Sequence, residues 1–229
     1  MVHAPRAAIL GDSTRHDELE GYIKGIIRHF ANDDRILCWD LYNEPANPAT
    51  QRGRAELEVQ NKHVYTLVLL KKVFQWAREL NPIQPLTAGI WRGDASHWGI
   101  PDSLPELDRY MIMNSDVITF HAYDNDMERV KQKIAGLKKY ERPLLCTEYM
   151  ARTNNNTFKN MLPILKENKI AAINWGLVSG KTNTIYPWQS WKQEFTAEPE
   201  LWFHDIFHQD GAPFSKEEVE FIHRMISEN

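Results

Sequence analysis

The sequence predicts an α/β protein built around a parallel β-sheet. Short apolar segments alternate along the chain with longer segments whose apolar residues recur at helical spacing, which is typical of parallel sheets covered by helices. Two of the apolar segments run directly into a glutamate, and parallel sheets gather such residues at the carboxyl ends of their strands. The five predicted strands are residues 36–41, 85–90, 117–121, 143–147 and 170–175.

The first of these strands organises the rest of the prediction. Residues 36–41 read Ile-Leu-Cys-Trp-Asp-Leu, bounded by Asp33-Asp34 before and Pro45 after. This short, mostly apolar run predicts a strand buried on both faces, as in parallel sheets. Asn43 and Glu44 then emerge at its carboxyl end, where catalytic groups of such folds lie. Glu44 is therefore a candidate catalytic residue.

The helices follow from apolar residues that recur every three or four positions. A helix over residues 154–169 contains Pro163, which predicts a late start or a kink. Asp126 is the expected N-cap of the helix that reaches Leu137. Residues 1–15 lack periodicity and predict a loop, as do residues 176–199. The other predicted helices are residues 17–31, 56–80, 104–114, 200–207 and 215–227.

Length and composition predict one soluble globular domain covering residues 1–229, with 42% hydrophobic and 25% charged residues. The net charge of −4 and the lack of a basic block argue against nucleic acid and anionic membranes as partners. The chain has no run of 18 apolar residues, and its first residues lack a signal-peptide pattern. Cellular location stays open between secreted and cytoplasmic.

A second strand ends in a glutamate about a hundred residues after the first. Residues 142–149 read Arg-Pro-Leu-Leu-Cys-Thr-Glu-Tyr, which places Glu148 at a strand end. Two glutamates at the carboxyl ends of parallel strands face one cleft, which is the arrangement that glycoside hydrolysis needs. Cys38 and Cys146 lie inside the two strands, and burial as free thiols is their expected state.

Four motifs together resemble the retaining glycoside hydrolases of clan A, most closely the family 5 cellulases and mannanases. They are residues 39–45 (Trp-Asp-Leu-Tyr-Asn-Glu-Pro), 119–123 (Thr-Phe-His-Ala-Tyr), 146–149 (Cys-Thr-Glu-Tyr) and 173–176 (Ile-Asn-Trp-Gly). The resemblance runs from about residue 17 to the end. It implies a (β/α)8 barrel in which the five strands are strands four to eight, so that the chain is the C-terminal part of a catalytic domain. An incomplete barrel would need to cover its open sheet edge, by self-association for example.

The resemblance also implies roles for the two glutamates. Glu44 matches the general acid/base and Glu148 the nucleophile of a double displacement. A like charge at about 5 Å separates the pKa values of such a pair and keeps the acid protonated. Asn43 matches the residue that binds the sugar 2-hydroxyl, although a turn residue before Pro45 is an equally simple interpretation.

Further site residues come from the other motifs and from aromatic loops. By resemblance, His121 and Tyr123 flank the catalytic pair, and the tyrosine hydroxyl contacts the nucleophile. Trp175 resembles the aromatic platform under the sugar, since ring faces suit apolar sugar faces; a core-filling tryptophan is its alternative. Trp91 and Trp188 lie in loops on the same predicted face and are candidates for substrate binding.

The leading prediction is a retaining β-glycosidase or β-glycanase, similar to cellulases and mannanases, that acts on an oligo- or polysaccharide. A non-enzymatic carbohydrate-binding fragment that depends on partner segments is the alternative, and a hydrolase that uses His121 as base is a third. Neither a metal nor a cofactor is expected. The nine histidines lack zinc spacing, Asp124-Asn125-Asp126 lacks the rest of a calcium loop, and no strand is followed by a glycine-rich phosphate loop.

Overall fold

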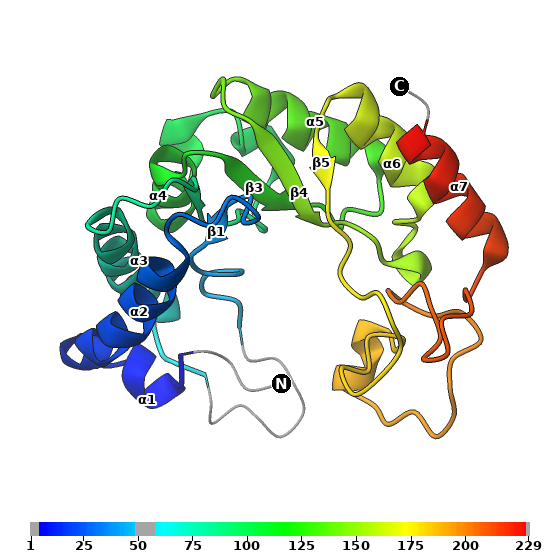
Figure 1. Ribbon diagram of the computed structural model, residues 1–229, viewed down its shortest axis with the longest axis horizontal. Coiled ribbons are helices and arrows are strands. Elements are labelled where there is room, and N and C mark those ends of the chain that lie inside the picture. Colours follow the sequence, from blue (N-terminus) through cyan, green and yellow to red (C-terminus); the bar gives the residue numbers. More distant parts are fainter. Residues whose placement is uncertain (1–4, 49–57, 228–229) are drawn as a thin grey trace. The chain divides into compact units, whose positions relative to one another are not determined.

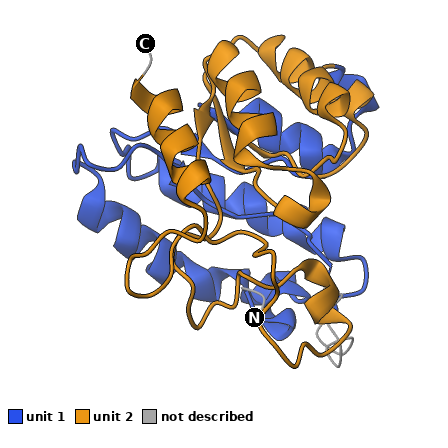
Figure 2. Cartoon of the chain, turned by 90° about the vertical axis from the view of Figure 1, so that its right-hand side faces the viewer, with its two compact units in different colours: residues 1–91, 100–119 blue, residues 92–99, 120–229 orange. Residues whose placement is uncertain are grey.

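The computed structural model describes residues 5–48 and 58–227. The chain forms two compact units (Figure 2). Unit 1 comprises Met1–Trp91 and Ile100–Thr119, and unit 2 comprises Arg92–Gly99 and Phe120–Asn229. The chain therefore enters unit 2 twice. The expectation of a single catalytic domain over residues 1–229 stays a prediction.

Unit 1 contains a small parallel sheet and four α-helices among its described residues (Figure 1). Trp39 lies opposite Leu86 and Asp40 opposite Thr87 in the sheet. The elements are α1 (Ala7–Leu10), a 3₁₀ segment (Ser13–Leu19), α2 (Glu20–Phe30), β1 (Trp39–Asp40), α3 (Lys62–Arg78), β2 (Leu86–Thr87), a 3₁₀ turn (Pro101–Ser103) and α4 (Glu106–Asn114).

A hydrophobic cluster around α3 holds the helices of unit 1 together. Leu69, Val73 and Trp76 of α3 are buried with Leu10 of α1, and Ile23 of α2 packs against them. Burying one such side chain contributes about 1.5–3 kcal/mol, whereas one backbone hydrogen bond contributes about 1 kcal/mol net. Packing against α3 therefore stabilises unit 1 more than the few hydrogen bonds of its two-residue strands.

Unit 2 contains most of a three-stranded sheet in the order β3-β4-β5. β3 begins in unit 1 and ends in unit 2, and β4 and β5 pair in parallel. The elements are a 3₁₀ turn (Ala95–His97), β3 (Ile118–His121), α5 (Met127–Lys138), β4 (Leu144–Glu148), a 3₁₀ turn (Arg152–Asn154), α6 (Phe158–Glu167), β5 (Ala171–Ala172), a 3₁₀ segment (Trp188–Trp191) and α7 (Lys216–Ser227).

The helices of unit 2 begin where side-chain caps are available. The Asp126 carboxylate accepts a hydrogen bond from the Glu128 backbone N–H at 2.9 Å, which confirms the predicted cap of α5. Thr157 accepts from the Asn160 N–H at 3.2 Å and starts α6 at Phe158. The predicted late start of this helix is therefore confirmed, with Pro163 inside it.

Three expectations about unit 1 are wrong. Residues 7–10 and 13–15 are helical rather than a loop, because Leu10 joins the α3 cluster. The first strand is only Trp39–Asp40 and is not buried on both faces, since Leu37 is 67% exposed. Pro85 has no N–H to extend the ladder, which keeps β2 short. The helix predicted over 56–80 begins at Lys62; residues 56 and 57 and the loop around Gly53 lie outside the described residues.

Two expectations about unit 2 are also wrong. Residues 200–207 are not helical, because their N–H groups bond to distant carbonyls: Phe203 to Ile185 at 2.8 Å and Phe207 to Leu177 at 2.9 Å. The last strand is shorter than residues 170–175 and comprises only Ala171–Ala172. The other predicted helices and strands are present with boundaries shifted by one to four residues.

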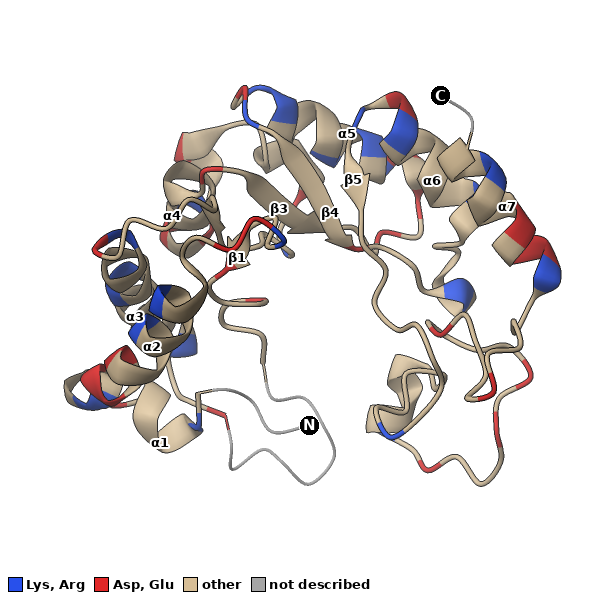
Figure 3. Cartoon of the chain, in the orientation of Figure 1, with Lys and Arg blue, Asp and Glu red and all other residues tan. Residues whose placement is uncertain are grey.

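Charges of both signs lie along the helices of the chain (Figure 3). On α5, Lys131 pairs with Glu128 at 2.7 Å, and on α7 acidic residues in the first turn precede Arg224 in the last. None of the described helices combines the length and the apolar character that crossing a membrane requires.

Candidate active site

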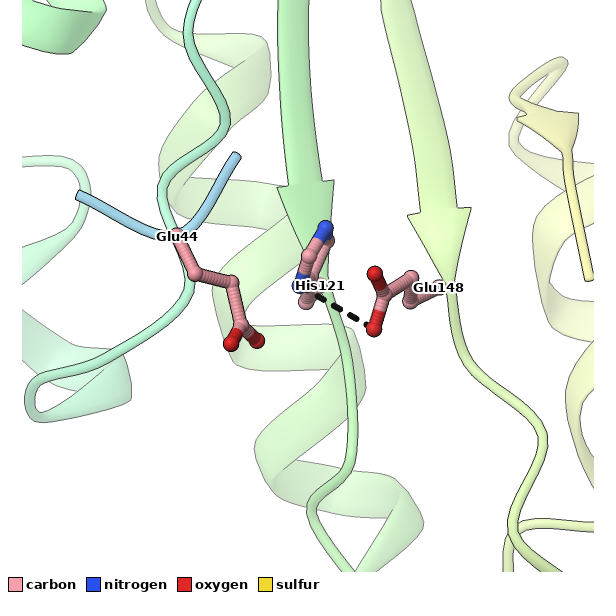
Figure 4. A group of neighbouring side chains, drawn as sticks. All are labelled: Glu44, His121 and Glu148. Carbon is pink, nitrogen blue, oxygen red and sulfur yellow. Dashed lines mark ion pairs between the residues drawn. The ribbon is translucent and has the colours of Figure 1, made fainter. Parts of the chain in front are cut away.

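Glu148 is the last residue of β4, and its carboxylate is held from the neighbouring strand (Figure 4). The Tyr123 hydroxyl donates a hydrogen bond to Glu148 Oε2 at 3.1 Å. His121 Nδ1 lies 3.5 Å from the same oxygen, and the imidazole is 1% exposed. Since His121 is the last residue of β3, adjacent strand ends bring the two side chains together. The Ala122 N–H also donates to the Glu148 carbonyl at 2.9 Å.

Tyr123 is held in place by its backbone and by its ring. Its carbonyl accepts a hydrogen bond from the Asn154 side chain at 2.7 Å. Its ring lies edge to face with Trp188, with centroids 5.2 Å apart at 89°. The ring of His204 is 6.0 Å away. These contacts direct the Tyr123 hydroxyl at the carboxylate, so Tyr123 orients Glu148.

Glu44 lies in unit 1, in a turn after β1 (Figure 4). Its φ of 43° is uncommon for a residue with a side chain. The Asn47 side-chain amide donates to its carboxylate, and the Asn47 N–H donates to its carbonyl at 3.0 Å. Trp91 Nε1 donates to the Pro45 carbonyl at 3.2 Å, so this tryptophan anchors the same turn. The side chain of Asn43 is exposed.

The structure places the other aromatic candidates in different environments. Trp175 follows β5 and is 39% exposed, so its side chain is not buried in the described chain. Trp188 is half-buried and contacts Tyr123, so it belongs to the surroundings of Glu148. Trp98, a further loop tryptophan, is fully buried against Phe120 and packs its loop instead.

Asp124 and its neighbours form ion pairs and a helix cap. Asp124 pairs with the buried Lys133 and with Arg129, the latter at 3.3 Å, and Asp126 caps α5. A carboxylate already paired with two cations has little affinity for a metal ion. The expectation of metal-free catalysis remains a prediction.

Two residues near Glu148, His204 and Arg152, have no motif in the sequence that predicts them. His204 Nδ1 lies 2.5 Å from the Met150 carbonyl oxygen, and burial lowers the pKa of His204 to about 4. Arg152 donates to the Trp202 carbonyl at 2.9 Å. Their local signal in the sequence is an aromatic segment at residues 202–204, which the helical spacing of residues 200–207 predicts to be part of a helix.

The fold is shared with solved glycoside hydrolases. An endo-β-1,4-xylanase of glycoside hydrolase family 10 from Gloeophyllum trabeum has a TM-score of 0.56 at 13% identity, over 92% of this chain and 67% of that chain. An intracellular xylanase from Thermoanaerobacterium saccharolyticum has a TM-score of 0.54 at 15% identity, over 87% of this chain and 63% of that one. A β-glucuronidase from Bacteroides uniformis has a TM-score of 0.57 at 14% identity, over 87% of this chain and 25% of that one.

These identities show a common fold, that of the (β/α)8 barrel glycoside hydrolases, and no more. The two small parallel sheets correspond to part of such a barrel. A comparison with curated protein sequences finds no match. Residues 3–181 match the family model for cellulase, glycosyl hydrolase family 5. The chain therefore belongs to glycosyl hydrolase family 5, which confirms the family that its motifs indicated.

Proposed function

We propose that this protein hydrolyses β-linked glycans or glycosides with retention of configuration, with Glu148 as nucleophile and Glu44 as general acid/base. One observation carries the proposal. In a member of a glycoside hydrolase family, the Glu148 carboxylate lies at a strand end with the Tyr123 hydroxyl at 3.1 Å and His121 at 3.5 Å. A carboxylate fixed in this way is oriented for attack on an anomeric carbon.

The reaction proceeds in two displacements. Glu148 attacks the anomeric carbon while the glycosidic C–O bond breaks and Glu44 gives its proton to the leaving oxygen. Water then attacks the glycosyl–Glu148 ester, Glu44 takes its proton, and the free carboxylate of Glu148 is restored. Such a mechanism requires the two carboxyl groups to lie about 5–5.5 Å apart. This separation is the geometric condition of the proposal.

The remaining candidates serve substrate binding. Asn43 donates to the sugar 2-hydroxyl, a contact that tightens in the transition state. The exposed Trp175 stacks on a sugar ring. Trp188 lines the region around Glu148, through its contact with Tyr123, and Trp91 lines the turn that carries Glu44. The substrate class is a β-linked oligo- or polysaccharide. Comparing the rates of hydrolysis of matched β-glucans, β-mannans and β-xylans shows which of the three backbone sugars the enzyme prefers.

Replacing the nucleophile tests the proposal directly. Glu148→Gln should lower kcat/KM on aryl β-glycosides by about a thousandfold or more, because the glycosyl–enzyme ester no longer forms. A 2-deoxy-2-fluoro aryl glycoside should label Glu148 in the wild type, as found by peptide mass spectrometry. Glu128→Gln, an exposed carboxylate on α5, is the control and should keep full activity. Labelling of another residue contradicts the assignment.

The acid/base role of Glu44 has a separate signature. Glu44→Gln should lose little first-step rate on dinitrophenyl glycosides, which need no proton on the leaving group, and about a hundredfold or more on unactivated glycans. Equal losses on both substrates contradict the role. If the wild type binds glycans without hydrolysing any of them, the carbohydrate-binding alternative replaces the proposal.

A further inference from the structure

Three hydrogen bonds tie the segment 202–204 to the chain just after Glu148. The Arg152 N–H donates to the Phe203 carbonyl at 3.0 Å, and the Arg152 guanidinium donates to the Trp202 carbonyl at 2.9 Å. His204 Nδ1 lies 2.5 Å from the carbonyl of Met150, two residues beyond Glu148. Because a carbonyl only accepts hydrogen bonds, His204 carries its proton on Nδ1.

The same histidine belongs to an aromatic cluster around Tyr123. The His204 ring lies 6.0 Å from the Tyr123 ring and 6.4 Å from the Trp188 ring. Trp188 in turn packs edge to face against Phe203 at 4.9 Å. The cluster is packed, since Phe203 is 1% and His204 4% exposed. The position of the Tyr123 ring therefore depends on where the 202–204 segment is anchored.

We propose that His204 is a positioning residue that acts through Tyr123: its ring, held in place by the bond to the Met150 carbonyl, packs in the aromatic cluster that keeps the Tyr123 hydroxyl on the Glu148 carboxylate. The inference rests on the proposed function, in which Glu148 is the nucleophile. His204 contacts the wall of the site and not the substrate. Its contribution is the orientation of the reacting carboxylate, and small errors of orientation are costly in catalysis.

The neutral state of His204 suits this role. Burial lowers the pKa of His204 to about 4; the bond to Met150 opposes this shift and the charge of Arg152 adds to it, so the ring is uncharged at neutral pH. Among the titratable groups around this cluster in unit 2, Arg152 lies beside His204 and is paired with Glu218, Asp205 is the next residue and is buried, and His121 and Tyr123 lie beside Glu148. An uncharged ring can pack against Tyr123 and Trp188 without burying a charge.

The test compares His204→Ala and His204→Asn with Tyr123→Phe. Asparagine keeps an N–H that can reach the Met150 carbonyl and so guards against misfolding, but it lacks the ring. Both His204 variants should lower kcat about tenfold with KM nearly unchanged, the loss expected for one misaligned hydrogen bond. The double variant His204→Asn/Tyr123→Phe should lose no more kcat than Tyr123→Phe alone, since both substitutions remove the same contact between Tyr123 and Glu148.

His208→Ala is the matched control, because the His208 ring packs on Trp202 of the 202–204 segment, with ring centroids 4.4 Å apart, and makes no ring contact with Tyr123 in the described chain. It should keep wild-type kcat.

A crystal structure of His204→Asn gives a readout that needs no activity: the distance from the Tyr123 hydroxyl to Glu148 Oε2 should lengthen beyond hydrogen-bonding range. An unchanged distance, wild-type kcat in His204→Asn, or additive losses in the double variant overturn the proposal. A lengthened distance in a protein that hydrolyses no glycoside supports the positioning role and refutes the proposed function.

Discussion

At the scale of single residues, the two cysteine thiols of the chain differ in how deeply they are buried. Cys146 is fully buried in β4, and desolvation raises its pKa well above the ordinary value. Cys38 is only half-buried before β1, and desolvation, with the charge of Asp40, raises its pKa as well. Both cysteines are free, as the sequence predicted, but the expectation that Cys38 is buried inside a strand is wrong, because β1 begins only at Trp39. The thiolate is the reactive form, so both should react slowly in the folded protein.

Alkylation measures this difference. In native protein at pH 8, iodoacetamide should modify Cys38 slowly and leave Cys146 unmodified, and urea should expose both to rapid reaction. Peptide mass spectrometry follows each site, and Cys38→Ser isolates Cys146. Rapid modification of Cys146 without denaturant would contradict its burial.

At the scale of elements, α7 is attached to the rest of unit 2 by a buried ion pair. The Arg152 guanidinium donates to both carboxylate oxygens of Glu218 at 2.8–3.1 Å, with side chains 2% and 18% exposed. It also lies over the Phe214 ring at 4.9 Å. The neighbouring Glu217 pairs with Lys159 of α6 at 2.6 Å, but these side chains are 71% and 55% exposed. Two adjacent glutamates thus meet opposite environments.

Substituting each glutamate in turn tests this contrast. Glu218→Ala should lower the free energy of unfolding by about 3 kcal/mol, because it leaves the buried Arg152 charge without its partner. Glu217→Ala should leave the urea midpoint nearly unchanged, because solvent screens the exposed pair. Urea titration followed by circular dichroism gives both values. Equal effects would show that the pair with Arg152 does not attach α7.

At the scale of the whole molecule, His204 makes stability depend on pH. Its pKa is about 4 in the folded protein against 6.5 as the ordinary value. Between these values the unfolded chain binds a proton that the folded chain does not, so stability is full above pH 6.5 and falls toward pH 4. Desolvation raises the pKa of the buried Asp205, so its contribution to stability falls as pH rises, opposite to that of His204.

The expected loss from His204 is on the order of 2 to 3 kcal/mol between pH 6.5 and pH 4. His204→Asn cannot titrate and should remove this part of the dependence while leaving that of Asp205. Unfolding free energies from urea titrations at several pH values measure it. Parallel curves for the wild type and the variant would show that His204 does not carry the effect.

Self-association of the chain stays a prediction. In the described part of unit 2, β5 is the last strand of the sheet, and its two residues are exposed. Sedimentation velocity over a range of concentrations measures it.

The sequence by itself determined the features that depend on neighbouring residues. Apolar spacing predicted α2, α3, α4 and α7, the Asp126 side chain predicted the start of α5, and the apolar run before Glu148 predicted a strand that ends in a carboxylate. The family also followed from short local motifs, and residues 3–181 match it. Each of these signals lies within a few positions of the residue concerned.

The tertiary structure decided which distant groups meet. Residues 200–207 have local helical spacing, but carbonyls of Leu177, Thr184 and Ile185 take their N–H groups, so the helix does not form. The same segment brings His204 to Met150 and Tyr123 from more than fifty residues away. Local periodicity reports which face of an element is apolar, whereas the partner of a buried polar group is chosen by packing between elements. The surroundings of Glu148 therefore required the folded chain.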